Sequence, residues 1–232
     1  MSERLDFIEV GTADFNTIIE SCSDDARGIS IEPLKFYLDN LPNKPFVKKL
    51  AAALVPTPIS SINTFYIEPE LIGNPEFGIQ GFMRGCNSVG KPHDYHIRYT
   101  GFSTGYEDEY TTYRNLIEEG LVTIAKVPAL TYHQLMEMYD IEYVEQIKLD
   151  TEGQDSALLN SILDYYKVSG KKLPSKIEFE TNFHNKYEDL IEVCSRLMSL
   201  NYKLQIGDSY YSDFRDFDGS FEMDCVAILI ED

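Results

Sequence analysis

The chain has 232 residues, of which 20 are Lys or Arg and 39 are Asp or Glu, so its formal net charge is −19 at pH 7. Proteins that bind nucleic acid need a basic face to neutralise phosphates, and this acidic excess argues against that partner and against anionic membranes. The composition is 43% hydrophobic and 25% charged, which is typical of a globular protein. We therefore expect one domain over residues 1–232.

The cysteines and the N-terminal residues indicate a compartment. The four cysteines are scattered and form no C-x-x-C pair, so they predict small buried hydrophobic side chains and no zinc site or disulfide framework. The first residues are acidic where a secretory signal needs basic ones, and no apolar run reaches about 18 residues. The sequence therefore predicts a cytoplasmic protein without a membrane partner.

The first quarter of the chain alternates strand and helix patterns. In order, we predict a strand at 7–11, a helix capped by Asp14, a strand at 28–32, a helix from Pro33 to Leu38 and a strand at 47–55. Phe15, Ile18 and Ile19 would form the apolar face of the first helix. Such an alternation predicts an α/β fold with a parallel sheet and right-handed crossovers.

The middle of the chain is less regular, and the alternation then resumes. After a strand at 64–67, a loop-rich insertion occupies about 68–120, where glycine and polar residues have turn chemistry. The remaining predicted elements are a strand at 122–128, a helix at 131–139 with Leu135 and Met138 on its apolar side, a strand at 144–150, helices at 155–166 and 187–200 flanking a strand at 176–180, and an antiparallel closing pair at 203–206 and 225–230.

Ligands of open parallel sheets bind at the carboxyl ends of the strands. Gly11 ends the first strand, and Glu32, 21 residues later, ends the second, which is the spacing of an acid that binds ribose hydroxyls. Ala13 and Asn16 replace the later glycines of a G-x-G-x-x-G motif, which weakens pyrophosphate binding but leaves a nucleoside possible. Alternatively, Gly11 is only a tight turn and Glu32 a solvated acid.

Three segments carry a resemblance to a known family: residues 7–12, residues 29–33 and, above all, the run Lys-Leu-Asp-Thr-Glu-Gly-Gln-Asp at 148–155. They resemble the FkbM family of S-adenosylmethionine-dependent methyltransferases, over 6–33 and 122–183. The resemblance implies a Rossmann-like, seven-strand class I methyltransferase fold, mostly parallel with an antiparallel closing pair. It also implies methylation of a hydroxyl on a saccharide or small metabolite.

By position, the resemblance assigns cofactor and catalytic roles. S-adenosyl-L-methionine would contact Glu9, Gly11 and Thr12 at its methionine end, Glu32 at its ribose, Ala53 and Leu54 at its adenine, and also Asp150. Asp150 would orient or deprotonate the acceptor, with Lys148 and Glu152 on the same face of the strand. The alternative for these three residues is a structural network of paired charges.

Residues of the insertion are candidates for the acceptor site. We expect Arg84, Asn87, Ser88 and His93 to contact substrate. His93 and His96 are candidate acid/base groups of that site, but the alternative, that both are exposed loop histidines, carries more weight. Four tyrosines could stack on an acceptor or simply pack the loop: Tyr99, Tyr106, Tyr110 and Tyr113. In a side hypothesis, Asp150, Glu180 and Asn182 would supply oxygen ligands to a Mg²⁺ ion. The main interpretation assigns no metal site.

Two other functions stay open. One is a non-catalytic binding or regulatory module with the same Rossmann-like fold, because the first glycine motif is incomplete. The other is an NAD-dependent oxidoreductase, which the missing phosphate-binding glycines disfavour.

Overall fold

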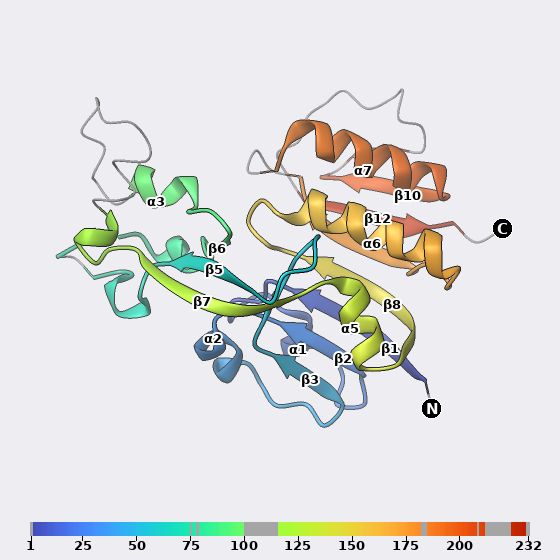
Figure 1. Cartoon of the computed structure of the whole chain (residues 1–232), viewed down its shortest axis with the longest axis horizontal. Helices are drawn as coiled ribbons and strands as arrows, with labels where there is room; N and C mark the ends of the chain where they lie inside the picture. Colours follow the sequence, from blue (N-terminus) through green and yellow to red (C-terminus); the bar gives the residue numbers. More distant parts are fainter. Residues whose placement is uncertain are drawn as a thin grey trace.

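A computed structural model describes residues 2–74, 76–77, 79–99, 116–181, 185–207, 209–211 and 224–230. The described strands form two sheets (Figure 1), one of eight strands and one of four. The large sheet has the spatial order β11 (Ser209–Tyr211), β10 (Tyr202–Ile206), β12 (Asp224–Leu229), β9 (Lys176–Glu180), β8 (Ile141–Leu149), β1 (Glu3–Val10), β2 (Gly28–Ile31) and β3 (Val47–Leu50). The small sheet has the order β4 (Ala53–Leu54), β7 (Thr123–Leu130), β5 (Ser61–Tyr66) and β6 (Ser88–Val89).

The strands β3, β2, β1, β8 and β9 run parallel, whereas β12 is antiparallel to both β9 and β10. The expected mostly parallel α/β sheet with an antiparallel closing pair is therefore confirmed. The large sheet has eight described strands where seven were expected, because β11 pairs with β10 at the edge. The small sheet was not predicted.

Helices cover both faces of the large sheet. The covering helices are α1 (Ile18–Ser21) and α2 (Lys35–Asn40) on one face and α5 (Tyr132–Met138), α6 (Asp155–Ser169) and α7 (Tyr187–Ser199) on the other. Helix α3 (Asp94–Tyr99) and the short 3₁₀ turns η1 (Pro69–Leu71) and η2 (Gly81–Arg84) belong to the insertion, and α3 lies near the small sheet (Figure 1). Ile8 and Val10 of β1 pack in one core with α5, α6 and α7, whereas Phe7 packs on the other face with α1 and α2. This alternation follows from the two-residue period of a strand.

Helix α6 shows how the periodicity determines the packing. Leu158, Leu159, Ile162 and Leu163 are all buried, as their spacing predicts. Burial of each such side chain stabilises the fold by about 2 kcal/mol. In α5, Leu135 is buried as predicted, but Met138 is 61% exposed, because the helix ends there and Met136 faces the core instead.

The expected strand at 47–55 is two strands in two sheets. β3 closes the large sheet beside β2, and after residues 51–52 the chain continues as β4, which pairs with β7 of the small sheet. The small sheet consequently lies beyond the carboxyl ends of β1–β3 (Figure 1). An uninterrupted apolar run gives no sign of such a change of sheet.

The first helix begins later than expected. Thr17, not Asp14, caps α1, in a capping box with Glu20, and Phe15 is 41% exposed rather than on the buried face. The sequence T-x-x-E at 17–20 carries this signal. Helix α2 likewise begins at Lys35, after Leu34 in the N-cap position, so Pro33 lies before the helix.

All four cysteines are free thiols, and three of them are buried. In the part of the chain that the structure describes, no helix combines the length and apolar character needed to cross a membrane.

Candidate functional site

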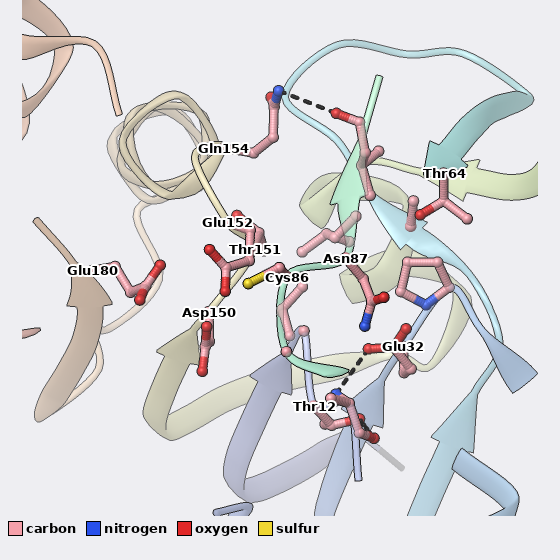
Figure 2. Close-up of a pocket in the computed structure, with 18 of the residues that line it drawn as sticks. Thr12, Glu32, Thr64, Cys86, Asn87, Asp150, Thr151, Glu152, Gln154 and Glu180 are labelled. Carbon is pink, nitrogen blue, oxygen red and sulfur yellow. Dashed lines mark hydrogen bonds between the residues drawn. The ribbon is translucent and has the colours of Figure 1, made fainter. Parts of the chain in front are cut away.

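A cavity of about 700 Å³ lies between the carboxyl-terminal edge of the large sheet and the small sheet (Figure 2). Its size suits a nucleoside-sized ligand. Predicted residues on its wall are Gly11, Thr12, Glu32, Ala53, Leu54, Asn87, Asp150 and Glu152. They come from the ends of β1, β2 and β8, from β4 and from the insertion.

Position 11 requires a glycine because its backbone lies against the backbone of Asp150. It has φ +79°, and a Cβ at this position would lie 1.7 Å from the carbonyl oxygen of Asp150. The tight-turn interpretation of Gly11 is therefore sufficient to explain the glycine, whatever ligand approaches it.

Glu32 is a buried acid aimed at the cavity, so its interpretation as a solvated acid is wrong. It is 3% exposed, and its two oxygens accept hydrogen bonds from the backbone N–H groups of Ala13 and Leu34, each at 2.9 Å. Burial raises the pKa of Glu32 to about 7, although these hydrogen bonds lower it. Each carboxylate oxygen can accept a second hydrogen bond, so the group can still receive two hydroxyls.

Glu9 and Lys148 form a pair beside α1 and do not line the cavity. The Ile18 N–H donates to Glu9 Oε1 at 2.8 Å, and Lys148 Nζ donates to the same oxygen at 3.3 Å and to the Asn16 carbonyl at 2.8 Å. Burial raises the pKa of Glu9, with Ile18 and Lys148 opposing that shift. A carboxylate already occupies the place where a pyrophosphate would meet the helix N-terminus.

Three carboxylates gather on the opposite side of the cavity from Glu32 (Figure 2): Asp150, Glu152 and Glu180. One oxygen of each lies within 4.8 Å of the others. Burial, followed by the charges of Asp155 and Glu152, raises the pKa of Asp150 to about 7, and burial followed by Glu152 raises that of Glu180 to about 9. Their oxygens are the ligand type that Mg²⁺ prefers. Asn182, the third residue of the magnesium variant, lies outside the described residues.

The predicted acceptor residues have different environments. Asn87 lines the cavity and donates from Nδ2 to the Arg84 carbonyl at 2.9 Å. Arg84 itself forms an ion pair with Asp14 and does not line the cavity. Ser88 is also outside the lining, because its hydroxyl donates to the Lys91 carbonyl at 2.7 Å.

The histidines of the insertion are buried, so their interpretation as exposed loop residues is wrong. His93 is 2% exposed and His96 is fully buried. His93 Nε2 lies 2.9 Å from Glu152 Oε2, and His96 Nε2 lies 2.7 Å from the Cys86 carbonyl. Burial, followed by the neighbouring His93, lowers the pKa of His96 to about 4. His93 is therefore not in the cavity wall, contrary to the expectation, but it contacts two residues of that wall, Glu152 and Tyr95.

Sequence reasoning missed several lining residues, namely Phe15, Phe82, Cys86, Tyr95, Thr151 and Gln154. Gln154 Nε2 reaches the Val89 carbonyl at 3.5 Å (Figure 2), so it joins the large sheet's loop to the insertion. Only the fold brings these residues together, because they belong to no shared motif. The side chain of Tyr99 and residues Tyr106, Tyr110 and Tyr113 lie outside the described part.

The chain was compared with protein-family models, curated proteins and solved structures, and no significant match was found in any of the three comparisons.

Proposed function

We propose that this protein is an S-adenosylmethionine-dependent methyltransferase. The observation that carries the proposal is the position of Glu32: a buried carboxylate at the end of β2 that lines a cavity large enough for a nucleoside. A carboxylate in this position suits a vicinal diol, because both hydroxyls must donate. Glu9 already fills the end of α1, which favours a nucleoside without a pyrophosphate over NAD.

The topology supports the same proposal. The order β3-β2-β1-β8-β9 follows the doubly wound arrangement 3-2-1-4-5, and the antiparallel β12 lies between β9 and β10. An antiparallel strand inserted at this position is what the proposed class I methyltransferase fold would have. In this arrangement Thr12 and Gly11 would lie under the methionine end of the cofactor. Ala53 and Leu54 of β4, both in the cavity wall, would flank its adenine.

The acidic side of the cavity suits the charge of the cofactor. Asp150, Glu152 and Glu180 face a space where the described lining residues include no Lys, Arg or His. A sulfonium is a cation, so the ionised members of this group would attract it, and its charge would in turn favour their ionisation. The same lining disfavours phosphorylated or carboxylated acceptors and favours a neutral hydroxyl of a saccharide or small metabolite.

Asp150 is the base of the proposed reaction. The acceptor oxygen would attack the methyl carbon while the carbon–sulfur bond breaks and its electron pair goes to sulfur. The hydroxyl proton passes to the Asp150 carboxylate, leaving a methyl ether, S-adenosylhomocysteine and a protonated acid. A base whose pKa is about 7 matches neutral pH.

Calorimetric titration with S-adenosylhomocysteine tests the cofactor assignment. We expect wild-type binding, a loss of at least about tenfold in Glu32→Gln, and no change in the control Glu192→Gln, whose side chain is 61% exposed on α7. Wild type should bind the 2′-deoxy analogue more weakly than S-adenosylhomocysteine itself. In Glu32→Gln the two compounds should bind with similar affinity. Absence of wild-type binding would refute the proposal.

Methyl transfer separates the catalytic function from the alternative. Binding of S-adenosylmethionine without transfer to any neutral saccharide or phenol in a radiolabel screen would support a non-catalytic binding module. Tight NADH binding, measured by fluorescence, would instead contradict the interpretation that Glu9 blocks pyrophosphate binding at the N-terminus of α1.

A further inference from the structure

The insertion contacts the acidic side of the cavity through His93 and Glu152. His93 comes from the segment between β6 and α3, whereas Glu152 follows β8 of the large sheet. The side chain of His93 is 1% exposed and that of Glu152 17%. The hydrogen bond between them is therefore shielded from solvent, which strengthens it.

The backbone around His93 identifies its tautomer. The Tyr95 N–H donates to His93 Nδ1 at 3.0 Å, and a backbone N–H can only donate. Nδ1 is therefore the acceptor, and the ring proton of the neutral imidazole lies on Nε2. His93 consequently donates from Nε2 to Glu152 Oε2 at 2.9 Å.

The tautomer also decides between two interpretations of this cluster. Cys86, His93 and Glu152 have ligand atoms within 4.8 Å of one another, and their types could hold a transition metal. Metal coordination through Nε2 would require the proton on Nδ1, opposite the Tyr95 N–H. The geometry therefore favours a His–Glu hydrogen bond over a metal centre.

Glu152 is held in an unusual backbone conformation. Its φ is +52°, and Gly153 follows with φ +101°. Residues other than glycine rarely have a positive φ, and they keep this conformation where their surroundings fix it. This conformation directs the Glu152 carboxylate to the cavity wall, where His93 holds it from the other side (Figure 2 shows Glu152 beside Asp150 and Glu180).

We infer that His93 is a positioning residue that holds the Glu152 carboxylate at the reacting end of the cavity, facing the positive charge of the methyl donor. This inference rests on the proposed function. The insertion then contributes to recognition of the donor as well as to the acceptor site. Its role is specific, because a carboxylate placed there distinguishes the sulfonium of S-adenosylmethionine from the neutral thioether of S-adenosylhomocysteine.

Paired titrations test this role by calorimetry. In His93→Phe, which keeps a ring but loses the donor, affinity for S-adenosylmethionine should fall about fivefold to tenfold and affinity for S-adenosylhomocysteine less than about twofold. His93→Gln, which restores an N–H donor, should return the ratio of the two affinities to within about twofold of wild type. His133→Gln, on the exposed face of α5, is the control.

An equal loss of both affinities in His93→Phe would show a merely structural role and would overturn the inference. If His93→Phe does not fold, judged by its thermal unfolding, Glu152→Gln replaces it, and an unchanged affinity ratio there has the same meaning.

The tautomer is measured independently of any ligand by two-bond ¹H–¹⁵N correlation of the four histidines. We expect His93 protonated on Nε2, with a resonance that shifts in Glu152→Gln. A proton on Nδ1 would overturn the inference even if S-adenosylmethionine binds. Absence of nucleoside binding together with the expected tautomer would instead overturn the proposed function and leave the His93–Glu152 pair intact.

Discussion

Gly11 lies directly against the carbonyl oxygen of Asp150, at a separation that leaves no space for a β-carbon. The contact joins the ends of two neighbouring parallel strands, β1 and β8. The shape of the cavity wall at both strand ends therefore depends on one backbone-to-backbone approach.

Replacement of Gly11 by alanine should destabilise the protein by more than about 3 kcal/mol, because the added carbon must displace backbone and the φ of +79° is strained for alanine. Gly120→Ala is the matched control, since φ is +72° there and no atom lies within 4 Å. It should cost only about 1 kcal/mol. Urea unfolding measures both values, and equal losses would contradict the close approach as the cause.

The ion pair between Arg84 and Asp14 should be worth much more than an exposed pair. The Asp14 side chain is 1% exposed, and Arg84→Met would leave its carboxylate with the Asn40 amide at 2.8 Å. We expect a loss of about 3 kcal/mol. Lys35→Met removes the cation of an exposed pair with Asp39, with side chains 72% and 60% exposed, and should cost under about 0.5 kcal/mol.

A similar loss in both variants, measured by urea unfolding, would mean that Asp14 is not buried in solution. Because Arg84 lies on the insertion and Asp14 follows β1, the Arg84→Met variant should also become more sensitive to proteolysis within 68–120.

Stability should decrease as the pH rises. Burial raises the pKa of Asp150 to about 7 and that of Glu180 to about 9, above the values near 4 of an unfolded chain. At a pH between the unfolded-state and folded-state pKa values, the folded protein therefore binds more protons than the unfolded chain. The stability that these two groups contribute is fully present below about pH 4, and it is lost as the pH rises through their folded-state pKa values. We expect the unfolding temperature to be about 5 °C higher at pH 5.5 than at pH 8.5.

The double variant Asp150→Asn, Glu180→Gln should reduce this difference, and the measurement is a series of calorimetric scans at constant ionic strength. Repetition in 0.5 M NaCl separates the local effect from general repulsion at a net charge of −19, because salt screens distant charges more strongly than buried ones. A slope that disappears in salt would assign the pH effect to the surface.

Donor binding should have the opposite pH dependence. Ionised Asp150 would attract the sulfonium of the proposed donor. Burial, followed by the charges of Asp155 and Glu152, raises the pKa of Asp150, and Lys148 opposes this shift. Affinity for S-adenosylmethionine should consequently rise severalfold from pH 6 to pH 8, whereas affinity for S-adenosylhomocysteine should change less. Calorimetry at three pH values measures both, and a parallel change in the two affinities would argue against Asp150 as the responsible group.

Much of the large sheet follows from patterns within single segments. Strand β1 with its terminal glycine, the position of Glu32 and the buried face of α6 were all predictable, because the necessary signal is a local period or spacing. The cap Thr17 was also visible in its T-x-x-E sequence. These features need no knowledge of distant residues.

The rest of the site depends on contacts between distant segments. Glu9 has Lys148 as its partner, 139 positions away, and His93 has Glu152, 59 positions away. No local pattern specifies such pairs. The change of sheet at 51–52 was equally hidden, because a buried strand and the next one form a single apolar run.

The register of the small sheet has a consequence for engineering. Tyr66, at the end of β5, pairs directly with Thr123, at the start of β7. Residues 67–122 therefore leave and rejoin the fold at adjacent positions, and a short hairpin turn could replace them without breaking the pairing of β5 and β7. The insertion's part of the cavity wall could be exchanged as a cassette between those two positions, provided that the replacement supplies partners for Asp14 and Glu152, which Arg84 and His93 contact.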